Sequence, residues 1–295
     1  MRTEGNRLCM AKRSVAAAAL VGLTILAVYL PVLSGLVRQW ARDENYSHGF
    51  IIIPFAVYFA WRKRRALVAA PAAPGIGGLL VVIASLIVLL AGLAGAELFL
   101  TRISLIGVVA GAIWFLWGWK HLRLLAFPVL LLVLMVPLPA IIFNQIVFPL
   151  QLLASRAAEA ALTFGGVPVL REGNVLELAT TKLEVAQACS GIRSLISLLT
   201  LGILLGKLSE QGLPMRILLA VLTVPVAIAA NAARVAGTGF AANGIGPEAA
   251  EGFFHTFSGW LVFVAAFALL LGVQRLLLRF SHGPLAWRRS APLGA

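Results

Sequence analysis

Apolar runs about as long as a bilayer is thick fill most of the chain, and they limit its possible folds more than any other feature. A helix that crosses a membrane needs roughly 20 apolar residues. Hydrophobic residues make up 61% of the 295 residues and charged residues only 12%, whereas soluble domains carry about a quarter charged residues. The sequence therefore predicts an all-α polytopic membrane protein with about eight transmembrane helices. The expected spans are residues 14–37, 47–61, 75–95, 98–118, 122–141, 190–206, 213–233 and 254–275.

Lysine and arginine residues are distributed unevenly between the loops of this arrangement. If the N-terminus is cytoplasmic, the cytoplasmic segments hold 16 of the 24 basic residues and two acidic residues. The outer segments then hold 8 basic and 9 acidic residues. Basic residues are enriched in cytoplasmic loops, so we expect both termini in the cytoplasm. The net charge of +13 therefore reflects membrane orientation, and we expect no nucleic-acid partner.

One long region without an expected span, residues 142–189, falls on the outer side. Its first half, FPLQLLASRAAEAALTF, places Gln151, Ser155 and Glu159 on one helical face, so we expect an amphipathic helix in the outer interface. Its second half alternates apolar and polar residues between turn signals, which predicts two or three short strands. We interpret residues 1–295 as a single integral membrane domain with this extracytoplasmic insertion.

Cys189 follows this region, at the outer end of the sixth expected span. Cys9 lies on the cytoplasmic side, so the two cysteines cannot pair within one chain, and Cys189 is expected to be a free thiol. A lone cysteine in a membrane helix is most often a small apolar filler. Three neighbours favour a reactive thiol instead: Ser190 as an N-cap beside the helix dipole, Gly191 with room for a backbone to approach, and Arg193 within the apolar stretch.

Two more ionisable side chains are expected at the same depth as Cys189. Arg234 lies at the outer end of the seventh span and His255 at the start of the eighth. Taken singly, Arg234 could cap a helix or snorkel to the interface, and His255 could be a structural interface residue. Together with Cys189 they supply a nucleophile, a positive group for a thiolate or oxyanion, and an acid or base.

At these residues the sequence resembles the exosortase/archaeosortase family of multipass membrane transpeptidases. The similar segments are ACSGIRSL, NAARVAGTG and FHTFSGW, in this order and each at the outer end of a span, with a weaker segment YSHGF. The resemblance covers roughly residues 15–280 and implies a catalytic constellation of Cys189, Arg234 and His255. We expect further site-organising or substrate-binding residues, namely Arg193, Ser190, His48 and Tyr46.

The resemblance also implies the substrates and the location. The substrates would be exported proteins with a C-terminal sorting signal of the PEP-CTERM kind, which has a short proline-containing motif, one transmembrane helix and a basic tail. The enzyme would cut near the motif and transfer the protein to an acceptor molecule whose identity is unknown. We expect it in a bacterial inner membrane, with the active site facing the periplasm and with no metal or cofactor.

Two other functions are compatible with a polytopic membrane chain. In a transporter or flippase the two arginines and the histidine would line a polar path, with charged groups near the bilayer midplane and with repeated halves. A membrane acyltransferase could use His255 with a lipid donor and would not need a thiol. A Cys189→Ser variant with full activity would favour one of these alternatives.

Overall fold

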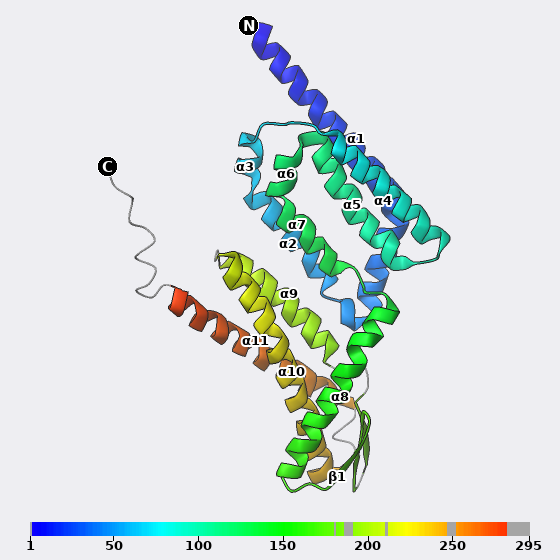
Figure 1. Ribbon diagram of the computed structural model, residues 1–295, viewed down its shortest axis with the longest axis vertical. Helices are drawn as coiled ribbons and strands as arrows, with labels where there is room; N and C mark the ends of the chain where they lie inside the picture. Colours follow the sequence, from blue (N-terminus) through cyan, green and yellow to red (C-terminus); the bar gives the residue numbers. More distant parts are fainter. Residues whose placement is uncertain (1, 180, 186–190, 210–211, 247–251, 282–295) are drawn as a thin grey trace, which may run out of the picture. The chain divides into compact units, whose positions relative to one another are not determined.

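The fold of the chain is known from a computed structural model, which describes residues 2–179, 181–185, 191–209, 212–246 and 252–281 (Figure 1). The chain divides into two compact units, Met1–Ala140 and Ile141–Ala295. We call them the N-terminal unit and the C-terminal unit and describe each by itself. The single integral membrane domain expected over residues 1–295 stays a prediction.

All the regular elements in the described residues of the N-terminal unit are helices. A long helix is followed by short helices and by one antiparallel helix pair. Its elements are α1 (Arg2–Arg42), the 3-10 helix η1 (Glu44–Tyr46), α2 (Gly49–Arg62), α3 (Arg64–Ala69), α4 (Ile76–Ala94), α5 (Leu98–Trp117), α6 (Trp119–Leu124), α7 (Ala126–Leu131) and the 3-10 helix η2 (Leu132–Met135).

Helices α4 and α5 pack against each other through glycines (Figure 1). A Cβ added at Gly78 would lie 2.2 Å from the backbone nitrogen of Phe115. A Cβ at Gly111 would lie 2.8 Å from the backbone nitrogen of Val82. Small residues let helix backbones approach closely, which favours helix association where no water drives it. The glycines of this pair therefore fix the distance between the two helices.

A break in the helical path after η2 is held by side chains from the start of the chain. In a continuous helix the Met135 carbonyl would accept a hydrogen bond from residue 139, but Pro139 has no N–H. The buried indole of Trp40 donates to this carbonyl instead, at 3.0 Å. The buried His48 donates from Nε2 to the Leu134 carbonyl, also at 3.0 Å. The polar rings therefore satisfy backbone groups that the break leaves exposed in an apolar interior.

Tyr46 belongs to the same group of side chains. It is buried and bonds to the backbone of Leu138, and burial raises the pKa of its phenol. The phenol therefore stays protonated. Tyr46 and His48 thus share the role of holding the segment that contains Leu134 and Leu138.

Replacing His48 with alanine is expected to destabilise the N-terminal unit. The Leu134 carbonyl would lose its donor, and an unsatisfied buried acceptor costs about 1–3 kcal/mol. The measurement is the thermal unfolding midpoint of the purified protein in detergent. Ser47→Ala is the matched control, since Ser47 is exposed and its change should stay within about 0.5 kcal/mol. A parental midpoint for His48→Ala, with impaired activity, would contradict the structural role and give His48 a part in the chemistry.

The C-terminal unit combines helices with a small antiparallel sheet of order β1-β2-β3. The strands follow the long first helix and precede three further helices. The elements are α8 (Ala140–Phe164), β1 (Val169–Glu172), β2 (Val175–Leu178), β3 (Lys182–Glu184), α9 (Ile192–Leu208), α10 (Leu213–Gly244) and α11 (Gly252–Ser281). The three strands confirm the β element expected in the second half of residues 142–189.

The sheet packs against α8 and the C-terminal part of α10 (Figure 1). A two-residue turn joins β1 and β2, and its Gly173 has φ +65°. The carbonyl of Gly173 accepts from the fully buried Ser155 hydroxyl of α8 at 3.0 Å. A shared core then joins the three parts, with members Ala154, Ala158, Leu162, Val167, Leu176, Leu178, Val185, Val235 and Ala236.

One ion pair links the sheet to α8, and a second links two strands within the sheet. Arg171 of β1 donates from Nε to Glu159 of α8 at 2.6 Å. Lys182 of β3 pairs with Glu177 of β2, and the hydrogen bond and charge of Glu177 raise the pKa of Lys182. The polar face of α8 that carries Ser155 and Glu159 is therefore the face that meets the sheet.

Helix length and composition identify six candidate membrane spans in the described residues. Five of them agree with expected spans. The count of eight is not confirmed. The six are Ala16–Arg42, Ile76–Ala94, Leu98–Trp117, Ala140–Phe164, Leu213–Gly244 and Phe257–Arg279.

The remaining expected spans are shorter or interrupted. Helix α2 has 14 residues and α9 has 17. The expected span 122–141 is divided into α6, α7 and η2, because Pro128 cannot donate to the Leu124 carbonyl and continue the helix. Helix α8 occupies the region in which an interfacial amphipathic helix was expected. At 25 residues it is long enough to cross a bilayer.

Candidate active site

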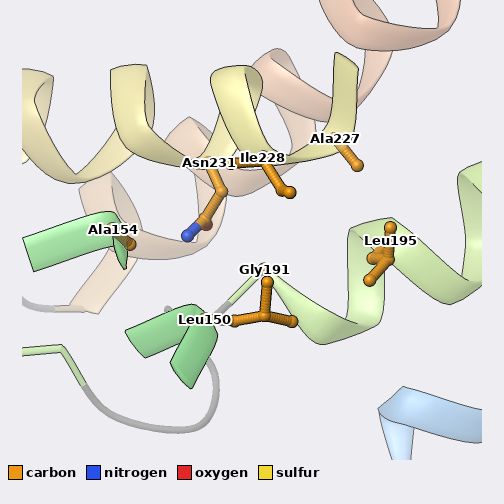
Figure 2. Close-up of a pocket in the computed structure, with 7 residues that line it drawn as sticks. All are labelled: Leu150, Ala154, Gly191, Leu195, Ala227, Ile228 and Asn231. Atoms are coloured by element: carbon orange, nitrogen blue, oxygen red, sulfur yellow. The ribbon is translucent and has the colours of Figure 1, made fainter. Parts of the chain in front are cut away.

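The first turn of α9 lies against α10. Gly191 is buried, occupies the N-cap position of α9 and has φ +80°, a left-handed conformation that glycine adopts without strain. A Cβ added to Gly191 would lie 2.7 Å from Cγ of Asn231. Figure 2 shows the Asn231 side chain extending from α10 into the space beside the start of α9. The backbone at the start of α9 is therefore fitted closely to one side chain of α10.

Arg234 of α10 lies against α11. A Cβ added at Gly259 would be 3.0 Å from both Cζ and Nη2 of the Arg234 guanidinium. The guanidinium therefore occupies the space that a side chain at position 259 would fill. Gly259 follows His255 by four residues, and residues four apart lie on the same face of a helix. The cation thus packs on the face of α11 that carries His255.

The backbone of α10 at Arg234 is held in place by the residues next to it. Val235 and Ala236 are buried in the core shared with α8 and the sheet. The Thr238 hydroxyl donates to the Arg234 carbonyl at 3.0 Å. The sheet therefore anchors α10 immediately beside Arg234, and the guanidinium extends from a fixed backbone.

Some of the expected site residues are described in the structure and others are not. Cys189 and Ser190 lie outside the described residues. His255 is in the first turn of α11, and its side chain is not described. The expected N-cap Ser190 is wrong, because α9 begins one residue later, with Gly191 as its N-cap.

The other expected site residues lie in the described part of the chain. Arg193 is in the first turn of α9 and is partly buried. His48 and Tyr46 belong to the N-terminal unit, where they bond to the backbone around Leu134 and Leu138. Their expected part in organising the site stays a prediction.

Sequence reasoning missed two residues that make the contacts between these helices. Asn231 is 4% exposed and precedes Arg234 by three residues. Gly259 follows His255 by one helical turn. The signals that could have found them are an amide one turn from an arginine, and a glycine one turn from a histidine. In the residues whose side chains are described, no three His, Cys, Asp or Glu side chains form a group that could hold a metal ion.

A family model described as transmembrane exosortase (Exosortase_EpsH) matches residues 40–272. The chain belongs to the transmembrane exosortase family. The match includes every described residue of the contacts around Arg234. Exosortases are membrane cysteine transpeptidases or proteases that act on PEP-CTERM-tagged proteins, so membership supports a general role in protein sorting at a membrane. No curated protein and no solved structure matches the chain.

Proposed function

We propose that this exosortase cleaves the C-terminal sorting signal of exported proteins at the outer face of a bacterial inner membrane, with Cys189 as nucleophile. The observation that carries the proposal is the packing of the Arg234 guanidinium on Gly259, one turn from His255. Asn231, on the same helix as Arg234, contacts Gly191, which is two residues after Cys189. One turn of α10, from Asn231 to Arg234, therefore contacts both the start of α9 and the first part of α11. A site shared by Cys189, Arg234 and His255 requires such an arrangement.

The chemistry follows from the three groups. The Cys189 thiolate attacks the carbonyl carbon of the scissile peptide bond, and Arg234 stabilises the thiolate or the oxyanion that forms. The S–C bond then remains while the C–N bond breaks, and His255 gives its proton to the leaving amine. In the second half, His255 accepts a proton from the acceptor nucleophile, which attacks the thioester and releases the thiolate.

The membrane orients the substrate for this reaction. A sorting signal of the PEP-CTERM kind carries one transmembrane helix and a basic tail. Basic tails favour the cytoplasmic side, so the motif before the substrate helix would lie at the outer interface. Lateral packing of that helix against the enzyme would bring the motif to the level of Cys189. The acceptor would be a membrane or envelope molecule.

Co-expression with a candidate substrate tests this function. A protein that ends in a PEP-CTERM-like signal should become smaller only in cells that make the enzyme. A second substrate with an altered proline-containing motif is the control, and it should stay at full length. The size is read by immunoblot with a tag before the motif. Full-length substrate in the presence of folded enzyme would contradict the proposed function.

The orientation of the chain gives a separate prediction. The distribution of basic residues puts Arg62–Arg65 and both termini in the cytoplasm and residues 142–189 outside. In intact cells a membrane-impermeant thiol reagent should therefore label Cys189 and leave Cys9 unlabelled. Single-cysteine variants separate the two signals, and permeabilised cells provide the control in which Cys9 reacts. Labelling of Cys9 alone in intact cells would refute the orientation.

A further inference from the structure

One end of the N-terminal unit carries a compact group of basic and tryptophan side chains. We propose that this group is a binding site for the headgroups of anionic phospholipids. It shares no residue with the candidate active site and does not depend on the chemistry at Cys189. We call residues 61–65 and 119–123 the basic platform. Its exposed members are two tryptophans, Trp61 and Trp119, and six basic residues, Arg62–Arg65, Lys120 and Arg123.

The basic platform lies where two candidate membrane spans end. Helix α4 begins at Ile76 and the antiparallel α5 ends at Trp117, so these two ends are neighbours. Helices α3 and α6 have six residues each, about 9 Å of helix, and neither can cross a bilayer. Val68 of α3 is nevertheless 88% exposed. Exposed apolar residues beside arginines are typical of a helix that lies in a membrane interface.

Three contacts hold the two halves of the basic platform together. The buried His121 of α6 donates from Nε2 to the Leu67 carbonyl of α3 at 3.2 Å. The Ala73 N–H, in the loop after α3, donates to the Trp117 carbonyl at 3.0 Å. Gly118 has φ +96°, and a Cβ there would overlap the Ala73 carbonyl oxygen. Helices α3 and α6 therefore lie side by side (Figure 1), and segments 54 residues apart in the sequence share one surface.

Two arginines of the basic platform lie over its tryptophan rings. Cζ of Arg64 is 3.9 Å from the centroid of the Trp61 ring, and Nη1 of Arg64 donates to the Trp61 carbonyl at 3.2 Å. Cζ of Arg123 is 6.0 Å from the Trp119 centroid, and Trp119 packs on Trp114 with ring centroids 5.0 Å apart. A ring beneath a guanidinium orients its planar fork, which matches the oxygens of a phosphate group. The exposed rings suit the headgroup region, where tryptophan is enriched.

No acidic residue lies near the basic platform in the sequence. Residues 45–96 and 98–158, the two stretches that contain it, hold no aspartate or glutamate. At the end of a membrane span the available anions are lipid headgroups, and basic pockets beside membrane helices bind them. A headgroup with a net negative charge, such as that of phosphatidylglycerol, fits this surface better than a zwitterionic one, whose cation would meet the same positive charge.

Membrane orientation requires only the charge of such residues, whereas the basic platform also has a fixed geometry. Arg275 and Arg279 of α11 show the simpler case. Both are exposed near the end of a candidate span. The only tryptophan in the sequence of α11 is Trp260, 15 residues before Arg275. Arg275 and Arg279 therefore supply a control pair that removes the same charge as Arg64 and Arg123.

Lipid titrations of the full-length protein test the site. The protein in detergent is titrated with phosphatidylglycerol, or with phosphatidylcholine of the same acyl chains, and native mass spectrometry gives the Kd. The parent should bind phosphatidylglycerol more tightly. Arg64→Gln with Arg123→Gln should raise this Kd at least about tenfold, since each basic residue near an anionic surface contributes a factor of about five. Arg275→Gln with Arg279→Gln should keep the parental Kd.

A second measurement locates the bound lipid. Bromine quenches the fluorescence of nearby indoles, so phosphatidylglycerol brominated close to its headgroup should quench the parent more strongly than brominated phosphatidylcholine does. Trp61→Phe with Trp119→Phe should remove most of this difference. An unchanged difference would place the lipid elsewhere and would overturn the proposal.

The titrations can also contradict the site. A parental Kd after loss of Arg64 and Arg123, or an equal loss of affinity in both arginine pairs, overturns it, since net charge alone would then explain binding. Displacement of phosphatidylglycerol by excess inorganic phosphate also overturns it, because the site would then take a free anion. If the first pair lowers the thermal unfolding midpoint, Lys63→Gln with Lys120→Gln replaces it and must also weaken phosphatidylglycerol binding. No substrate is used, so failure here is distinct from failure of the proposed function.

Discussion

Cys189→Ala is expected to insert normally and to lose substrate processing by at least about 10³-fold, because removal of the nucleophile leaves only binding and charge stabilisation. The measurement is the time course of substrate shortening in cells at matched enzyme levels. When the acceptor is withheld, the parental enzyme should accumulate a thioester at Cys189. Mass spectrometry of the enzyme detects this adduct, and alkaline hydroxylamine should release it.

Two controls make the Cys189 result specific. Cys9→Ala should process substrate at the parental rate, since Cys9 is expected on the cytoplasmic side. Cys189→Ser tests the requirement for a thiol with almost no change in size. If Cys189→Ala processed substrate at the parental rate, Cys189 would return to the role of an apolar filler. A fully active Cys189→Ser variant would favour a function that needs no thiol, such as acyl transfer through His255.

Arg234→Lys should process substrate at least about tenfold more slowly than the parent, and Arg234→Ala should lose about 10²–10³ in rate. A residue that only caps a helix or snorkels contributes under about 1 kcal/mol, and any long cation would serve. A residue that holds an oxyanion or thiolate needs the planar fork of arginine, for which lysine is a poor substitute. Time courses for the two variants, at matched protein levels, decide between these roles.

The contact with α11 offers a matched pair of variants for the same question. A Cβ at Gly259 would lie 3.0 Å from the Arg234 guanidinium, whereas a Cβ at Gly272 of the same helix meets no atom within 4 Å. Gly259→Ala should therefore displace the guanidinium and slow processing, while Gly272→Ala should not. A lysine variant at position 234 with the parental rate would return Arg234 to the capping role and leave Cys189 and His255 as a dyad.

The sequence predicts the long spans and the order of the site segments because both depend on local patterns. A continuous apolar run, such as the one that forms α4, needs no tertiary information to be recognised. The break near Pro137 and Pro139 was not foreseen, since apolar residues surround it and its hydrogen-bond partners lie about 90 residues earlier. Length alone made residues 122–141 look like one helix.

The start of α9 illustrates the limit at the site. Ser190 was expected to cap the helix through its side chain, which is a common local solution. The structure uses the left-handed backbone of Gly191 instead. The need for glycine at position 191 depends on the close packing of α10, and in particular on Asn231, which is 40 residues later in the sequence. A contact of this kind leaves no local pattern, so only the packed helices reveal it.

The hydrogen bonds of the helix break also bear on how the chain is made. Trp40 and His48 leave the ribosome long before Met135 and Leu134, which accept their bonds. A carbonyl without a donor is costly in lipid, but here the donors are already inserted when the acceptors emerge. Biogenesis can therefore proceed from the N-terminus onward, with each new segment completing bonds to one synthesised earlier. A truncated nascent chain that ends after Leu138 would already contain every group needed to close this break.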